Sequence, residues 1–250
     1  QVTRTVIVVD TTEPVVTAPE TITVAAVDAA GTPATNAAIA AFLADATATD
    51  NVDVTLTITN DAPAINFALN ATTVTFSATD AEGNTGTATS TVTIADQTAP
   101  VIAMLGNSPI EVEFASTYVD QGATASDNVD GDLTGSIATV NNVDTSILGA
   151  HTVTYNVSDA ATNPAVQATR TVTVEDTTEP VIEIIVDKVV DEETVLQFTV
   201  NASDLVSTAL VYSVNGLPTG ASLDSTTGSF TYTPGYEVSS LTSNTVFPVT

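Results

Sequence analysis

RTVIVVDTTEPV at residues 4–15 and RTVTVEDTTEPV at residues 170–181 are almost the same segment, and STVTIADQTAPV at residues 90–101 is a looser third copy. Each copy joins alternating β-branched and polar residues, which are typical of a strand, to an Asp, a short link containing Thr, and a Pro. This pattern indicates a point where one domain ends and the next begins. Because the segment recurs, the sequence predicts a tandem array of small domains.

The prolines of the three copies, Pro14, Pro100 and Pro180, set the expected domain boundaries. Residues 11–96 and 97–176 are predicted to be two whole domains. Residues 1–10 are expected to be the last strand of a preceding domain, and residues 177–250 a partial third domain whose late strand would start near the end of the chain. Short alternating strands separated by Asn, Asp and Gly turns are typical of a two-sheet sandwich.

The predicted fold class is therefore all-β, with tandem immunoglobulin-like β-sandwich domains in a linear array. One segment does not fit a strand. Residues 36–46, NAAIAAFLADA, are rich in Ala and place Ile39 and Leu43 four residues apart. This spacing predicts one short helix that covers an end of the first sandwich and has a packing role.

The composition narrows the function classes. Three basic residues stand against thirty acidic ones, and the formal net charge is −27. This charge argues against binding to nucleic acid and to anionic membrane surfaces, because both need Lys and Arg. No apolar run approaches the roughly 18 residues of a membrane span, so no membrane insertion is expected. There is no Cys, so disulfides cannot support domains of this size, and divalent cations would relieve the repulsion between acidic residues.

Acidic clusters recur at matching places in the two whole domains. Each domain has a first cluster after an early strand and a second cluster between its last two strands. A third acidic position precedes each domain. In an immunoglobulin-like sandwich these loops lie at the end where the chain enters, so we expect the clusters to converge at each junction. The candidate metal ligands are Asp10, Asp50, Asn51, Asp53, Asp80, Asp96, Asp127, Asn128, Asp130, Asp132, Asp159 and Asp176.

Calcium suits such clusters, because it takes 6–8 oxygen ligands from carboxylates, amides and backbone carbonyls. In the stretch from Asp130 to Asp132, alternate side chains can face one point, with Gly131 easing the turn. The pattern is not an EF-hand, since no helix flanks it. The third domain offers only Asp204 at the matching place. The alternative interpretation is that these residues form ordinary solvated turns.

Other chemistry has weaker support in the sequence. His151 is the only His, so a Ser-His-Asp triad could be built at most once. Carboxylate pairs are numerous, but their repetition in every domain favours a structural role over glycoside hydrolysis. Tyr155 and Phe76 occupy equivalent positions and are both expected in a core. We therefore predict that the chain is not an enzyme.

Three stretches carry family resemblances. Residues 10–96, with AAIAAFLADATATDNVD and TTVTFSATDAEGNTGTATSTVTIAD, resemble a hyalin-repeat (HYR) domain. IEVEFASTYVDQGATASDNVDGDLT at residues 110–134 resembles the bacterial Ig-like repeat of the crystal-protein type. The domain departs from that family at residues 159–163, where Thr162 replaces the Gly of its usual Asp-x-x-Gly-Asn pattern. GLPTGASLDSTTGSFTYTPGYE at residues 216–237 resembles the putative-Ig, cadherin-like repeat. The resemblance implies Ig-like sandwiches of large secreted or surface-attached bacterial proteins, often adhesins or matrix components.

Two functions remain open at this stage. The first is a structural stalk or fibre segment of an extracellular bacterial adhesin or matrix protein, stabilised by calcium at its junctions. The second is a set of accessory spacer or binding domains in a secreted enzyme that degrades a polysaccharide or a protein. Partners would be neighbouring repeats, or a cell-surface or matrix partner. Self-assembly into filaments is a further possibility.

Overall fold

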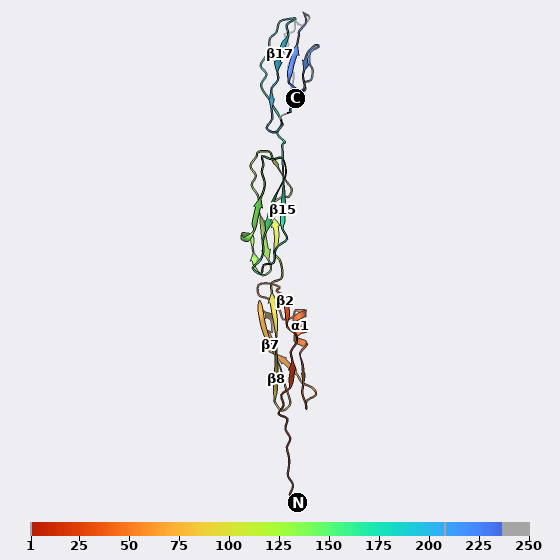
Figure 1. The fold of residues 1–250 in the computed structure, drawn as a ribbon, viewed down its shortest axis with the longest axis vertical. Helices are drawn as coiled ribbons and strands as arrows, with labels where there is room; N and C mark the ends of the chain where they lie inside the picture. Colours follow the sequence, from red (N-terminus) through yellow and green to blue (C-terminus); the bar gives the residue numbers. More distant parts are fainter. Residues whose placement is uncertain (1, 208, 237–250) are drawn as a thin grey trace. The chain divides into compact units, whose positions relative to one another are not determined.

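The computed structural model describes residues 2–207 and 209–236 (Figure 1). The chain divides into two compact units, and the boundary between them runs through the predicted second domain. The first unit comprises Gln1–Pro109, Val119–Asn142 and Thr152–Thr171, and the second comprises Ile110–Tyr118, Val143–His151 and Val172–Thr250. Short β-strands make up nearly all the regular structure of the described residues, so the all-β prediction is confirmed.

The first sandwich lies wholly in the first unit. Its four-stranded sheet has the order β2-β8-β7-β5, and the pairs β1-β4 and β3-β6 complete it. β2 runs parallel to β8, with Ile22 opposite Val92, whereas β7 and β8 form a long antiparallel hairpin (Figure 1). The strands are β1 (Val15–Thr17), β2 (Ile22–Ala25), β3 (Thr32–Pro33), β4 (Thr47–Thr49), β5 (Ile58–Asn60), β6 (Asn66–Phe67), β7 (Asn70–Thr79) and β8 (Thr85–Ala95).

Alternation along the β7–β8 hairpin builds the core of this sandwich. Val74 and Phe76 on β7 and Val92 and Ile94 on β8 are buried, because successive side chains of a strand point to opposite faces. The Thr residues between them are more exposed. The buried apolar cluster is completed by Val24, Ala26, Ile39, Phe42 and Phe67.

The predicted helix is present as α1 (Ala37–Ala44). It starts where Asn36 caps it, with the Asn36 carboxamide oxygen accepting a hydrogen bond from Ala38 N at 3.0 Å. It buries Ile39 and Phe42, and the Phe42 ring meets the edge of Phe76 at a centroid distance of 5.8 Å. The helix lies beside β2 (Figure 1), so its role is packing.

The first unit also contains much of the second sandwich. β11 pairs with β9 and β12, and β13 pairs with β14. Val153, Tyr155 and Val157 are buried on or just after β14. The first residues of β14, up to His151, and the last residues of β15, from Val172, belong to the second unit. These elements are β9 (Val101–Met104), β11 (Ala123–Asp127), β12 (Gly131–Asp132), the 3-10 turn η1 (Thr134–Ser136), β13 (Ala138–Asn141), β14 (Gly149–Asn156) and β15 (Ala168–Glu175).

A buried arginine side chain lies in this part of the first unit. Arg170 is fully buried and forms an ion pair with Asp120 at 3.2 Å. Its guanidinium also donates to the carbonyl oxygens of Leu105 and Gly122. The Tyr155 hydroxyl donates to Asp120 at 2.7 Å. Tyr155 is in the core, as predicted, but its hydroxyl has a partner there that Phe76 does not need.

In the second unit, β10 (Ile110–Glu113) runs parallel to the end of β15, with Ile110 opposite Val172. This pairing repeats that of β2 with β8. Farther along, β16 pairs with β18, and β17 pairs with β20, which also pairs with β19. The Phe198 and Phe230 rings stack at 4.8 Å. These strands are β16 (Val181–Ile182), β17 (Leu196–Thr199), β18 (Ala202–Ser203), β19 (Ser222–Leu223) and β20 (Ser229–Tyr232).

The structure tests neither of the two predictions about the chain ends. Residues 2–10 are not in a strand, and Val6, Ile7 and Val8 are each at least 80% exposed. A strand needs a hydrogen-bonded neighbour, so the assignment of residues 1–10 to a last strand stays a prediction. The late strand expected near the end of the third domain falls in residues 237–250, outside the described residues.

Candidate metal centres

The first candidate centre is built around the loop that joins β7 to β8. Asp80 accepts hydrogen bonds from the backbone N of Asn84 at 2.7 Å and from its side-chain Nδ2 at 2.6 Å. Asn84 Nδ2 also donates to the Asp10 carbonyl at 3.3 Å. Gly86 lets the entry segment lie against β8, because a Cβ there would meet Pro14 O at 1.7 Å. The hairpin loop therefore holds the segment that enters the domain.

The loop after β4 joins the same centre. Asp50 Oδ1 accepts from the backbone N of Val52 at 2.8 Å and of Asp53 at 3.0 Å. Asp53 Oδ2 in turn accepts from Ala81 N at 2.8 Å. Three segments that are distant in the sequence are thus linked by hydrogen bonds, as the sequence predicts.

The second centre, which we call the 96–159 centre, repeats this network residue by residue. Asp127 Oδ1 accepts from Val129 N at 2.7 Å and from Asp130 N at 3.1 Å. Asp130 Oδ2 accepts from Ala160 N at 2.7 Å. Asp159 accepts from the backbone N and the Nδ2 of Asn163, both at 2.7 Å. Asn163 Nδ2 donates to the Asp96 carbonyl at 3.3 Å.

Both networks leave buried carboxylate oxygens over. Oδ2 of Asp10 and Asp50, and Oδ2 of Asp96 and Asp127, are buried without a hydrogen-bond partner among the described residues. One carboxylate oxygen from each of Asp96, Asp130 and Asp159 lies within 4.8 Å of the others, and the same holds for Asp10, Asp80 and Glu82. A buried carboxylate oxygen without a donor is costly. Clustered anionic oxygens of this kind fit a hard divalent cation such as Ca²⁺.

The carboxyl groups of Asp96 and Asp80 differ in their electrostatics. Burial raises the pKa of the Asp96 carboxyl, and the nearby charges of Asp127, Asp159 and Asp130 raise it further against a hydrogen bond from Thr98. Burial also acts to raise the pKa of Asp80, but the hydrogen bonds from Asn84 outweigh it and the pKa is lowered. A bound cation would therefore offset the repulsion at Asp96.

Three of the predicted ligands, Asn51, Asn128 and Asp132, make hydrogen bonds outside the two carboxylate clusters. Asn51 donates to Thr12 Oγ1 at 3.4 Å, and Asn128 donates to the carbonyls of Ala26 and Val27, both at 3.1 Å. Asp132 is exposed and accepts from Thr134 N at 2.9 Å. Hydrogen bonding to the Thr134 side chain, and then to its backbone, lowers the pKa of Asp132. In these contacts, each of the three side chains is engaged with partners that are not carboxylates of the clusters.

The last predicted ligand, Asp176, belongs to the second unit. Its Oδ1 is buried and has no hydrogen-bond partner in the described part of the chain. In the same unit, Asp204 Oδ1 accepts from Val206 N at 2.8 Å and from Ser207 N at 2.6 Å. This copies the turns at Asp50 and Asp127, but Ser207 stands where those turns have their second Asp.

Three residues of the centres are absent from the predicted set: Glu82, Asn84 and Asn163. Glu82 supplies a carboxylate to the first cluster. Asn84 and Asn163 position the aspartates instead of offering charge. The signal in the sequence was their equal spacing, because each Asn follows its Asp, Asp80 or Asp159, by four residues.

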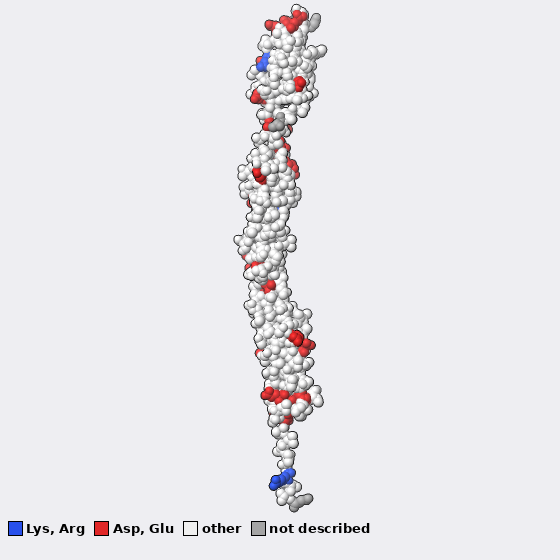
Figure 2. All heavy atoms as spheres, in the orientation of Figure 1, with Lys and Arg blue, Asp and Glu red and all other residues white. Residues whose placement is uncertain are grey.

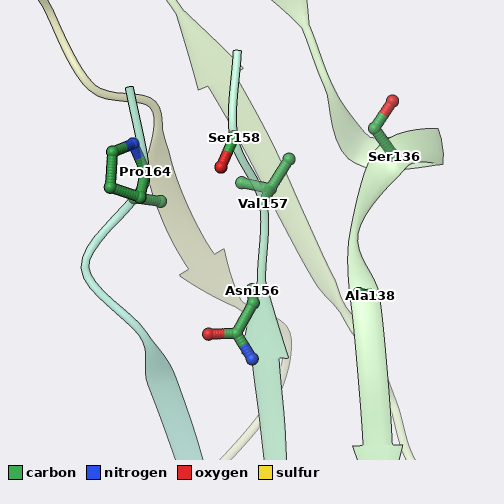
Figure 3. Close-up of a pocket in the computed structure, with 7 residues that line it drawn as sticks. Ser136, Ala138, Asn156, Val157, Ser158 and Pro164 are labelled. Carbon is green, nitrogen blue, oxygen red and sulfur yellow. The ribbon is translucent and has the colours of Figure 1, made fainter. Parts of the chain in front are cut away.

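A shallow pocket elsewhere in the first unit offers no comparable chemistry. It is lined by Ser136, Ala138, Asn156, Val157, Ser158, Pro164 and Ala165 (Figure 3). None of these seven side chains titrates near neutral pH. The lining therefore contains no acid, base or activated nucleophile of the kind that catalysis needs.

The described surface is strongly acidic. Red acidic atoms recur over the visible face, and basic atoms appear in two small spots (Figure 2), since Arg170 is buried. No helix among the described residues is long and apolar enough to span a membrane.

Each of the two sandwiches matches a known family model. Residues 9–94 match the HYR domain, and residues 102–174 match the Ig-like domain described as that of a bacterial surface protein. These are adhesion-type repeat domains of extracellular proteins and are in general not enzymes.

Two curated relatives are both named Hyalin. The one from Lytechinus variegatus is 34% identical over 75% of this chain, and the one from Strongylocentrotus purpuratus is 36% identical over 76%. The chain spans 36% of the length of the first relative and 16% of the second.

Solved structures with similar repeats include mouse cadherin-23 EC22-24, at 16% identity, 89% coverage of each chain and a TM-score of 0.33. A lipoprotein from Bacteroides thetaiotaomicron is 21% identical over 42% of this chain and 51% of its own, with a TM-score of 0.29. These TM-scores are low, and the fold assignment rests on the strands described above and on the two family matches. The chain is therefore a tandem array of immunoglobulin-like β-sandwich repeats, of which residues 9–94 are similar to the HYR domain and residues 102–174 to the Ig-like domain of a bacterial surface protein.

Proposed function

We propose that this chain is a structural stalk or fibre segment of a large extracellular adhesin or matrix protein, and that calcium stabilises its interdomain junctions. The observation that carries the proposal is the pair of matching carboxylate centres. In each centre, aspartates from the entry segment and from two loops converge, and two of their oxygens are buried without a donor among the described residues.

The proposed ligands come from both centres. The first is Asp10, Asp50, Asp53, Asp80 and Glu82, and the second is Asp96, Asp127, Asp130 and Asp159. We propose Asp176 as part of a third, incomplete site with Asp204, because the turn at Asp204 repeats the turns at Asp50 and Asp127. Carboxylate oxygens are the ligands that calcium prefers, whereas magnesium demands a stricter octahedral arrangement and keeps its waters.

The energetic reason is the acidity of the chain. Repulsion among the charges behind a net −27 destabilises small domains that lie near the margin of stability. At free calcium 10- to 100-fold above the dissociation constant, each site adds about 1.4–2.7 kcal/mol to the free energy of unfolding. A cation that binds the entry segment and two loops together also restrains the segment that joins the domains.

The proposal includes the domain organisation. Residues 11–96, 97–176 and 177–250 would be successive domains, with residues 1–10 belonging to a preceding one. We propose a bacterial surface as the setting, because the family matched by the second sandwich is described by that name. Spacer domains of a secreted enzyme would show the same calcium dependence and would differ by a catalytic module elsewhere in the protein.

The test is thermal unfolding of the chain in excess EDTA, in millimolar calcium and in millimolar magnesium. Calcium should raise the transition midpoints by several degrees, and magnesium should raise them much less. Asp50→Asn and Asp127→Asn should each remove part of the calcium effect, and the double variant should remove most of it. Identical midpoints in EDTA and calcium would show that the Asp loops are solvated turns and would overturn the proposal.

A further inference from the structure

The Asp127–Asp130 loop of the 96–159 centre has a second face. Between the two aspartates, Asn128 donates from Nδ2 to Ala26 O and to Val27 O, both at 3.1 Å. Val129 packs against the buried apolar cluster of the first sandwich. Two residues of this loop thus contact the first sandwich, while the two that flank them belong to the carboxylate centre.

The contacted turn is tied to the same centre from the other side. Ala26 N donates to Ala95 O at 2.8 Å, and the turn is closed by Val27 N donating to Gly31 O at 3.0 Å. Ala95 is the last residue of β8, and Asp96 follows it directly. A closed path therefore runs from Asp96 through Ala95 and Ala26 to Asn128, and back into the centre at Asp127.

We propose that Asn128 and Val129 are an interaction surface that takes the end of the preceding β-sandwich, and that a cation bound by Asp96, Asp127 and their neighbours fixes this docking. The partner that fits the surface is a sandwich end presenting two consecutive backbone carbonyls beside the edge of an apolar core. The inference rests on the proposed calcium site and adds a separate role for residues that bind no cation.

The physical coupling is direct. Without a cation, the carboxylates of the 96–159 centre repel one another, which pushes the Asp127–Asp130 loop away from Asp96 and from the turn at Ala26. A bound cation draws the same groups together, so the docked arrangement binds it better than an undocked one. A ligand that prefers one of two arrangements shifts the population toward it.

The first sandwich provides a matched control. Its Asp50–Asp53 loop makes the same internal hydrogen bonds, from Val52 N and Asp53 N to Asp50. However, Val52 is 59% exposed, and Asn51 donates to Thr12 within its own domain. Asn51→Ala therefore removes the same chemical group from the equivalent loop of the first sandwich without touching the docking contact.

The experiment uses spin labels on the full chain, which has no Cys of its own. Ile65→Cys and Val166→Cys place labels at positions that are 83% and 88% exposed, one in each sandwich. Pulsed dipolar spectroscopy then gives the distribution of distances between them, with and without calcium. The parent should show a narrow distribution in calcium and a broad one in EDTA.

In this labelled chain, Asn128→Ala should leave the distribution in calcium as broad as that of the metal-free parent. Asn51→Ala should leave it narrow. Asn128→Asp is a second variant, which keeps the shape of the side chain but removes both donors, and it should broaden the distribution in the same way. Thermal melts of each variant confirm that both sandwiches remain folded.

Calcium binding measured by titration calorimetry on the same samples separates the two claims. If the parent binds no calcium, the proposed function fails and the inference fails with it. If the parent binds calcium and its distribution narrows, but Asn128→Ala and Asn128→Asp also give narrow distributions, the docking role of Asn128 is overturned and the calcium site stands.

Discussion

At the scale of single residues, Arg170 shows how one position in the repeated segment is used in two ways. The segment places Arg170 in the second sandwich where the first has Ser90. Asp120 lies seven residues before Asp127, and Leu43 lies seven residues before the equivalent Asp50. The second sandwich has a buried ion pair with a Tyr hydroxyl, whereas the first has Leu43, Phe76 and a Ser90 hydroxyl without a partner among the described residues.

Arg170→Ala should destabilise the second sandwich by about 3–5 kcal/mol, because it removes the cation that balances the Asp120 carboxylate in a largely buried site. Ser90→Ala in the first sandwich should be nearly neutral, since its hydroxyl contributes no hydrogen bond among the described residues. Urea unfolding monitored by near-UV circular dichroism measures both. Equal effects of the two substitutions would contradict the account.

Asp96→Asn should have opposite effects with and without calcium. The pKa of Asp96 is raised, so its charged form is disfavoured in the folded chain: the stability that goes with the protonated group is present at low pH and is lost as the pH rises through the folded pKa. The neutral amide should therefore raise the midpoint in EDTA at pH 7. In calcium it should lower the midpoint, because a ligand is lost.

Asp80→Asn is the contrasting variant. The pKa of Asp80 is lowered, so its charged form stabilises the folded chain above the unfolded pKa, and that contribution is lost as the pH falls. The substitution should lower the midpoint both in EDTA and in calcium. Differential scanning calorimetry of the two variants would refute this distinction if Asp96→Asn also lowered the midpoint in EDTA.

At the scale of the element, the turns and loops explain which parts of the site could be predicted. Asp-Asn-Val-Asp appears in both sandwiches, and the second acidic loop precedes the last strand in each, so the convergence of Asp50, Asp80 and Asp10 follows from sandwich topology. Asn128 could not be separated from the ligands this way. Its partners are backbone carbonyls of another sandwich, which leave no mark in the sequence.

Helix α1 was recognisable from its composition and spacing, but its bounds were not. The sequence predicts residues 36–46, and the structure ends the helix at Ala44. The difference arises because Asn36 serves as the cap and Asp45 N closes the last turn on Phe42 O. The second buried residue of the helix is Phe42 and not Leu43, because the Phe42 ring packs against Phe76.

Asn36→Ala should lower the stability of the first sandwich by about 0.5–2 kcal/mol through loss of the helix cap. Asn36→Asp should retain most of it, because Asp caps equally well. Chemical denaturation of both variants in saturating calcium checks this, and the transition of the second sandwich serves as the internal reference. An unchanged midpoint for Asn36→Ala would mean that tertiary packing alone holds the helix.

At the scale of the whole molecule, the dominant feature is the repulsion between acidic residues. Thirty acidic residues stand against three basic ones, and one of the three, Arg170, is buried. The tandem sandwich architecture could be predicted from the repeated segment and the alternating strands, and the adhesion-type class from the family resemblance. The buried Arg170–Asp120 pair was not, because an isolated Arg in a strand looks like any exposed one until its neighbours are placed.

Sodium chloride should stabilise the metal-free chain, because it screens repulsion between acidic residues. Scanning calorimetry in EDTA at increasing salt should show rising midpoints. The added effect of calcium should shrink as salt increases, yet persist at high salt, because buried carboxylates are screened less than exposed ones. A calcium effect that vanished in moderate salt would indicate diffuse binding to the surface instead of the two centres.

The most direct test of the account is the number of calcium ions bound by the chain after chelator treatment, measured by titration calorimetry in a buffer with ample salt. The two complete centres predict two specific sites per chain, of which Asp50→Asn weakens one and Asp127→Asn weakens the other. Saturable binding at two sites, each sensitive to its own substitution, is the predicted result. Absence of saturable binding, or binding unaffected by both substitutions, would contradict the account.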